Sequence, residues 1–415
     1  MTTHFQRTVS RSLSNLQSRT GYEEPESPVP SSQQHEAPSR PPLGFPISIE
    51  GPMVWSGRDA ASFDSQILEL SPADVVEVEQ ALQSFLDLEL DGSEVSRENF
   101  RLPVLGPRLR DCAAEVHRGS GVVIVRGLAS KAYSAEDNTI MFLGLASYIG
   151  GQRGVQTSKG AMLTHVYESS SWTTPRERRH GIHTNSSLPF HSDMGCEILA
   201  IHIRDCAAQG GGTYVASAAA VYNAMMKANP WAVHTLAKHN WPVQVSRRGT
   251  SRFVLAPLLG FHWQSGNLVV SVDPYRIGPQ PAVADRGIPD LLPAQKEALA
   301  LLQQTATAQQ LRLPACQGDM VFINNWGTLH ARESYEDDST TTRHLVRLWL
   351  RDSEFAWEIP ESMKAPWEAS FGARAKKIVN RQYPVEPMPE YMEPKFSNGS
   401  AAFIMEESDE DDEAW

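Results

Sequence analysis

The stretch 188-LPFHSDMGC-196 carries the pattern from which the rest of the chain is best interpreted. Its polar residues His191 and Asp193 are two positions apart, so on an extended segment both side chains project to the same face. A third candidate ligand, His330, follows far downstream. Two imidazoles and one carboxylate are the ligand set of mononuclear non-haem iron sites, in which the remaining coordination positions stay open for chemistry.

A His-x-Asp pair alone is a weak signal, because the chain contains 13 histidines. The sequence around His330 strengthens it, since 318-GDMVFINNW-326 reads as a turn followed by a strand, and a second strand is predicted to begin near residue 344. Arg343 and Arg347 belong to that second segment, where buried guanidinium groups are costly without an anion. A guanidinium binds carboxylate in a bidentate fork, so Arg343 is a candidate for holding a dicarboxylate beside the metal.

The predicted secondary structure consists of many separated strands with few βαβ units, which favours a β-sandwich or barrel over a doubly wound sheet. Capping residues and apolar periodicity predict helices from Ser71 and from Ser134. Residues 151–190 show little periodicity and are predicted to form one long functional loop that leads into the His-x-Asp motif. Further helices are predicted at 218–238 and 292–309, and strands at 121–127, 198–203, 214–216, 268–272, 320–323 and 344–350.

Composition narrows the class of protein. The chain has 415 residues, of which 41% are hydrophobic and 21% charged, an ordinary globular balance. A formal net charge of −12 argues against a nucleic-acid partner, because phosphate binding needs a basic surface. No apolar run approaches the roughly 20 residues of a membrane span. Four cysteines without C-x-x-C spacing predict buried thiols in a reducing compartment rather than a disulfide framework.

The two ends of the chain differ from its middle. Residues 1–45 are rich in Ser, Pro, Gln and Arg and are predicted to be a disordered leader. Residues 386–415 end in an acidic run and are predicted to be a disordered tail, which leaves residues 46–385 as the catalytic domain. A cytoplasmic location is expected, while the arginine-rich N-terminus is also compatible with a mitochondrial presequence.

These motifs together give the chain a resemblance to the TauD/TfdA-type family of Fe(II)/2-oxoglutarate-dependent dioxygenases, in particular to its fungal, clavaminate synthase-like members. The resemblance implies a mainly β fold with flanking helices, built on a double-stranded β-helix (a cupin-like jelly roll). The stretches that carry it, in the order of the chain, are 133-YSAEDN-138, 153-RGVQ-156, 188-LPFHSDMGC-196, 211-GGT-213, 318-GDMVF-322, 329-LHAR-332 and 343-RHLVRLW-349.

By this resemblance His191, Asp193 and His330 are the catalytic iron ligands. Thr213 and Arg343 would bind the distal carboxylate of the cosubstrate 2-oxoglutarate, and O2 would be the oxidant. The expected activity is oxidation of an unactivated C–H bond in a small organic molecule, with release of succinate and CO2.

Two further residues are expected near the substrate. Arg347 lines up with a second family arginine close to substrate or cosubstrate, and Asn185 belongs to the segment that leads to the ligand pair. Neither residue identifies the substrate, and hydroxylation, desaturation and cyclisation would use the same site. The oligomeric state also cannot be read from the sequence.

Two alternatives remain open at this level. A non-catalytic ligand-binding protein on the same barrel would keep the fold, although an intact ligand set argues against it. A zinc-dependent hydrolase also uses three protein ligands, but the sequence near the His-x-Asp pair offers no obvious general-base glutamate, and the paired arginines would be unexplained.

Overall fold

The computed structural model describes residues 40–391, apart from 158–159, 248–249 and 280–286. The described chain thus extends a few residues beyond each predicted boundary of the catalytic domain. Most of the predicted leader and most of the acidic tail lie outside the described residues. Among the helices of the described part, none has the length and apolar character needed to cross a membrane.

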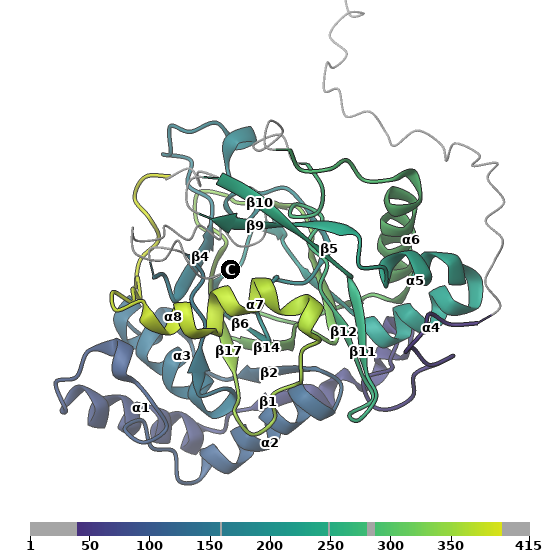
Figure 1. The fold of residues 1–415 in the computed structure, drawn as a ribbon. Coiled ribbons are helices and arrows are strands. Elements are labelled where there is room, and N and C mark those ends of the chain that lie inside the picture. The colour runs from purple at the N-terminus through teal and green to yellow at the C-terminus, as the bar shows by residue number, and fades with distance from the viewer. Residues whose placement is uncertain (1–39, 158–159, 248–249, 280–286, 392–415) are drawn as a thin grey trace, which may run out of the picture. The chain divides into compact units, whose positions relative to one another are not determined.

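The largest element is a seven-stranded sheet whose main path runs β1-β2-β14-β6-β17-β3, with β4 also paired to β17 (Figure 1). The pairing of β1 with β2 is parallel, and the other pairings are antiparallel. Its strands are β1 (Ile67–Glu69), β2 (Val122–Arg126), β14 (Met320–Asn324), β6 (Ile198–Asp205), β17 (His344–Arg351), β3 (Gln152–Arg153) and β4 (Leu163–Tyr167).

A second sheet has four strands in the order β13-β8-β15-β5. These strands are β13 (Leu311–Arg312), β8 (Thr213–Ser217), β15 (Thr328–Arg332) and β5 (Leu188–His191). Three two-stranded ribbons complete the strands of the described chain. They are β9 (Trp241–Arg247) with β10 (Thr250–Ala256), β11 (Leu259–His262) with β12 (Asn267–Val270), and β7 (Gln209–Gly210) with β16 (Tyr335–Glu336).

Strand periodicity divides the seven-stranded sheet into two buried faces. One face, which includes Ala200 and Leu348, packs in one apolar cluster with α1 (Pro72–Leu86), α2 (Leu105–Arg118) and α3 (Ala135–Ile149) (Figure 1). The opposite face, which includes Leu199 and Trp349, shares a cluster with Val215 of β8 in the four-stranded sheet.

The four-stranded sheet has helices on its far side. Ala216 of β8 and Leu329 of β15 belong to an apolar cluster with α4 (Ala218–Ala228), α5 (Pro230–Leu236) and α6 (Pro293–Gln309). The described chain is therefore layered as helices, sheet, sheet, helices. The two short helices α7 (Lys364–Phe371) and α8 (Ala373–Lys377) follow β17 in the chain.

The helix predictions are confirmed at their caps. Ser71 Oγ accepts the N–H of Asp74 and the Asp74 carboxylate accepts the N–H of Ser71, so both members of the predicted box are paired at the start of α1. Ser134 caps α3 in the same position. The helix predicted at 218–238 is divided at Asn229-Pro230 into α4 and α5, as its sequence indicates.

The prediction of one loop over residues 151–190 is wrong at both ends and in the middle. Strands β3 and β4 lie within that range and pair with β17, and β5 begins at Leu188. Two single-turn 3-10 helices, Arg176–Arg178 and Gly181–His183, follow. The apolar run of β4 is interrupted by Thr164 and His165, and it takes strand form because β17 offers it an edge. The described chain is a mixed α/β structure rather than the mainly β structure predicted, because helices contribute as much to the layering as the sheets.

Candidate metal and cosubstrate site

The three predicted metal ligands meet at the pairing of β5 with β15. His191 is the register partner of His330, which places residues 139 positions apart side by side, and their ring centroids are 4.1 Å apart. Asp193 follows two residues after β5. One ligand atom from each of the three side chains lies within 4.8 Å of the other two, and all three residues are buried.

The orientation of these side chains fits a divalent cation. His191 Nδ1 lies 2.8 Å from the carbonyl of Pro189, which leaves Nε2 for a metal. Both His191 Nε2 and His330 Nε2 lie 3.7 Å from Asp193 Oδ1. Oδ1 is buried and has no hydrogen-bond partner among the described residues, a state that costs free energy unless a cation compensates it.

The second carboxylate oxygen of Asp193 is held by the neighbouring sheet. Arg347 Nη1 and Trp349 Nε1 each donate to Oδ2 over 3.0 Å. Because both residues lie on the same face of β17, one strand fixes the carboxylate and turns Oδ1 toward the histidines. The main chain of Asp193 is fixed as well, since its N–H and carbonyl both bond the side-chain amide of Asn325.

The electrostatics of the site favour the forms that bind metal. Burial by itself would raise the pKa of Asp193, but the charges of Arg347, His330 and His191 and the Trp349 hydrogen bond together outweigh it and lower the pKa, so the carboxylate stays ionised. Burial lowers the pKa of His330 to about 3, so its imidazole is neutral at ordinary pH. A neutral imidazole and an ionised carboxylate are the states that a metal requires.

Arg343 lies just before β17, with its side chain almost fully buried. Its Nε donates to the carbonyl of Gly211 over 3.2 Å, its guanidinium carbon lies 5.2 Å from the centre of the Tyr335 ring, and Nη1 has no partner among the described residues. Gly211 has a φ of +72°, and a Cβ there would lie 2.9 Å from Arg343 Nε. A glycine is therefore needed at position 211 for Arg343 to approach this turn. Thr213 begins β8 two residues later and is opposite Arg332 of β15.

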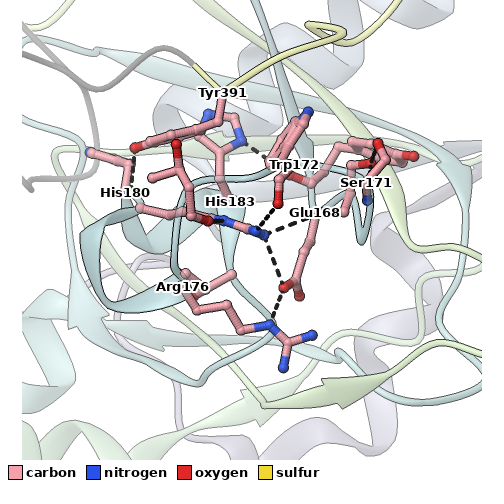
Figure 2. Close-up of polar contacts among 12 residues, drawn as sticks. Glu168, Ser171, Trp172, Arg176, His180, His183 and Tyr391 are labelled. Carbon is pink, nitrogen blue, oxygen red and sulfur yellow. Dashed lines mark hydrogen bonds and ion pairs between the residues drawn. The ribbon is translucent and has the colours of Figure 1, made fainter.

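Ion pairs within residues 168–179 stabilise the segment that precedes the ligand pair. Glu168 is buried and accepts Arg176 Nε at 2.5 Å and Arg179 Nη1 at 3.4 Å. Figure 2 shows Tyr391, from the C-terminal end of the described chain, beside His180, whose main-chain N–H donates to the Tyr391 hydroxyl over 2.6 Å. The indole of Trp172 donates to the carbonyls of residues 388 and 389, so the same C-terminal segment contacts this loop twice.

The same loop carries a buried histidine, His180. Its ring is buried, and neither nitrogen has a hydrogen-bond partner among the described residues. Burial lowers the pKa of His180 well below its ordinary value, and the charge of His183 lowers it further, while Asp193 acts in the opposite direction. The imidazole is therefore neutral, with one N–H donor and one acceptor nitrogen.

Comparison with known proteins gives this geometry a family. The family model described as "Taurine catabolism dioxygenase TauD, TfdA family" matches residues 84–349, well over half of the chain. The chain belongs to the TauD/TfdA family. It is accordingly an Fe(II)/2-oxoglutarate-dependent oxygenase of small molecules, and the alternatives of a zinc hydrolase and a non-catalytic binding protein lose their support.

Individual relatives agree with the family. The chain is 36% identical over 330 residues to the taurine hydroxylase-like protein SAT17 of Stachybotrys chartarum, covering 77% of this chain and 84% of that protein. It is 24% identical to FR-33289 synthase of Streptomyces rubellomurinus, with 73% and 90% covered. Among solved structures, an asparagine oxygenase superposes with a TM-score of 0.53 at 15% identity, covering 69% of this chain and 93% of that chain. The non-haem iron oxygenase OrfP gives 0.51 at 13%, with 71% and 97% covered.

The structure shows the protein contacts of the two predicted substrate residues, Arg347 and Asn185. Arg347 is bound to Asp193, and its Nε donates to Gln156 Oε1 over 3.0 Å. Asn185 is half-buried, and its carbonyl accepts the N–H of Tyr335. Contact of either residue with a substrate stays a prediction. Sequence reasoning did not single out Trp349, although its place two residues after Arg347 on the same strand face was a usable signal.

Proposed function

We propose that His191, Asp193 and His330 hold a single Fe(II) ion and that Arg343 and Thr213 bind the distal carboxylate of 2-oxoglutarate. The observation that carries the proposal is Asp193 Oδ1, a buried carboxylate oxygen without a donor among the described residues that faces two imidazole nitrogens. When bound, iron and 2-oxoglutarate would supply the activation of O2 that oxidises a C–H bond and releases succinate and CO2.

The chain's own residues would fix the cosubstrate and the ligand geometry. Arg343 has an Nη1 without a partner in the described part of the chain and lies among buried residues, so a carboxylate that reaches it would gain charge-assisted hydrogen bonds in a water-poor setting. Arg347 and Trp349 would keep the Asp193 carboxylate ionised and correctly turned. We assign Arg347 primarily this positioning role, since two of its nitrogens already have partners, and we keep Asn185 as a candidate for contact with the substrate.

We further propose that the two facing sheets are the double-stranded β-helix that the family resemblance implies. The pairing of β5 with β15 in one sheet and of β6 with β17 in the other supports this assignment. So does the apolar cluster that the two sheets share. The metal ligands would then lie at one end of that barrel. A small organic substrate and a cytoplasmic location complete the proposal, and expression of a fluorescent fusion in the source cells would test the location.

The assay is iron-dependent release of succinate from 2-oxoglutarate. His191→Ala should abolish succinate release, whereas Arg343→Ala should mainly raise the apparent KM for 2-oxoglutarate. His262→Ala, which removes an imidazole paired with Glu358 away from the ligand set, is the matched control and should retain activity. If succinate release is independent of iron, or if His191→Ala equals the wild type, the proposed function is wrong.

A further inference from the structure

Gln303 of α6 binds the strand that carries the first metal ligand. Its Oε1 accepts the main-chain N–H of Phe190 over 2.8 Å, and its Nε2 donates to the main-chain carbonyl of Phe190 over 2.6 Å. Phe190 lies in β5, directly before His191. A side-chain amide offers the same donor and acceptor as a peptide group. Gln303 therefore takes the place that a neighbouring strand would have beside β5.

Strand β5 has little other support on that side, because it is the end strand of the four-stranded sheet. It has four residues, and its register with β15 shifts between His330 and Arg332. An end strand presents unpaired main-chain groups along its free side, and such groups are costly when they are buried. Phe190 is only 3% exposed, and the Gln303 amide pairs both its N–H and its carbonyl. Loss of this amide would loosen β5 just before the metal ligand.

The main chain of Phe190 also affects how the His191 imidazole is oriented. His191 Nδ1 lies 2.8 Å from the carbonyl of Pro189, which is the residue on the other side of Phe190. This contact spans Phe190, so its geometry depends on the backbone dihedral angles that Gln303 holds. The bond made by the second ring nitrogen of a ligating histidine fixes the orientation of the ring. Gln303 can thus act on the metal site through the main chain of Phe190.

The next two residues of the motif are held in a similar way. The N–H of Ser192 donates to the carbonyl of Val272 over 2.7 Å, and the N–H of Val272 donates to Ser192 Oγ over 2.9 Å. The side-chain amide of Asn325 binds both the N–H and the carbonyl of Asp193. Three separate parts of the chain therefore fix the main chain around the ligand pair, and α6 supplies the contact at position 190.

We propose that Gln303 is a positioning residue of the metal site, whose amide holds the Phe190 main chain so that His191 Nε2 is directed to the ion. The inference rests on the proposed iron site and deepens it, because it names a residue outside the ligand set that controls metal affinity. The competing explanation is that Gln303 only fastens α6 to the sheet. In that case, loss of the amide would lower the stability of the fold and leave the metal geometry unchanged.

The experiment compares Gln303→Met with Gln295→Met in the full chain loaded with Co²⁺, a divalent ion that accepts imidazole and carboxylate ligands. Gln295 is the matched control, because it lies on the same helix and its amide also makes two main-chain bonds. It accepts the N–H of Leu292 over 2.9 Å and donates to the carbonyl of Asn240 over 3.1 Å. Each variant loses two hydrogen bonds of one side-chain amide, so both should unfold at a lower denaturant concentration than the wild type.

Only Gln303→Met should change the metal site. Competition with a chelator should show that its affinity for Co²⁺ is about 10-fold lower, at the lower end of the loss that follows removal of an outer partner of a metal ligand. The d–d absorption bands of bound Co²⁺, which report the ligand geometry, should shift in the same variant. Gln295→Met should keep the wild-type spectrum and an affinity within about twofold. Wild-type affinity and spectrum in Gln303→Met would refute the proposal, and so would equal changes in both variants.

The outcomes separate this inference from the proposed function. A wild type that binds no Co²⁺, or a His191→Ala variant that binds it equally well, would overturn the proposed iron site and this inference together. Normal binding by the wild type without an effect of Gln303→Met overturns the inference alone. Should Gln303→Met fail to fold, Gln303→Asn decides, because its amide is one methylene shorter and cannot keep both bonds to Phe190. It should weaken Co²⁺ binding by about 3- to 10-fold, and an unchanged affinity refutes the proposal.

Discussion

The indole of Trp349 should contribute directly to metal affinity. Trp349→Phe keeps a large aromatic ring at a position that is fully buried, but it removes the N–H that donates to Asp193 Oδ2 over 3.0 Å. A hydrogen bond to a charged group contributes about 1.5–3 kcal/mol, and about 1.4 kcal/mol corresponds to a tenfold change in affinity. The substitution should therefore weaken metal binding by about 10- to 100-fold, the range typical for loss of an outer partner of a metal ligand.

The assay is anaerobic titration of metal-free protein with Fe(II) in competition with a chelator of known affinity. Trp326→Phe is the matched control, because Trp326 is equally buried but its Nε1 has no hydrogen-bond partner among the described residues. The control should bind iron as the wild type does, although it loses the same volume from the core. Equal affinities for Trp349→Phe and wild type, or an equal loss in both variants, would refute the reasoning.

Further predictions concern the turn at Gly211, the buried imidazole of His117 and the hydroxyl of Tyr391. Gly211→Ala places a Cβ 2.9 Å from Arg343 Nε at a φ of +72°, so the Arg343 side chain must shift. The KM for 2-oxoglutarate should therefore rise about 10- to 100-fold, while the affinity for iron is unchanged. An unaltered KM would contradict this prediction. Burial lowers the pKa of His117 to about 4. Between about pH 6.5 and 4 the unfolded chain therefore binds more protons than the folded chain, so the free energy of unfolding decreases as the pH falls. His117→Leu should remove up to about 3 kcal/mol of that decrease, as measured by denaturant unfolding at each pH. An identical pH profile for the variant and the wild type would exclude this role. Tyr391→Phe removes the acceptor of the His180 N–H, so hydrogen exchange at residues 172–183 should quicken about 2- to 10-fold, and unchanged exchange would show that the contact does not hold the loop.

The candidate metal ligands could be predicted from the sequence because their spacing is local. His191 and Asp193 are two residues apart, so an extended segment can direct both side chains to one side wherever it lies in the fold, although strand β5 itself ends at His191. His330 could be chosen from 13 histidines only because a turn, a strand and two arginines surround it. The helix starts at Ser71 and Ser134 were predictable for the same reason, since a cap depends on residues within one turn.

What the sequence could not supply depends on pairing between distant segments. Trp349 reaches Asp193 only because β17 pairs with β6 in one particular register, in which Trp349 is opposite Leu199. Strand β4 lacks a strong apolar pattern and forms because β17 offers an edge, so residues 151–190 were predicted as a loop.

The most direct test of the account is to count metal and cosubstrate on the full chain under anaerobic conditions. Equilibrium dialysis of the wild type should give one Fe(II) and one 2-oxoglutarate per chain. His191→Ala and His330→Ala should each lose the iron, and Arg343→Gln should keep the iron while losing the cosubstrate. Retention of stoichiometric iron by both histidine variants would contradict the claim that these side chains share one metal ion.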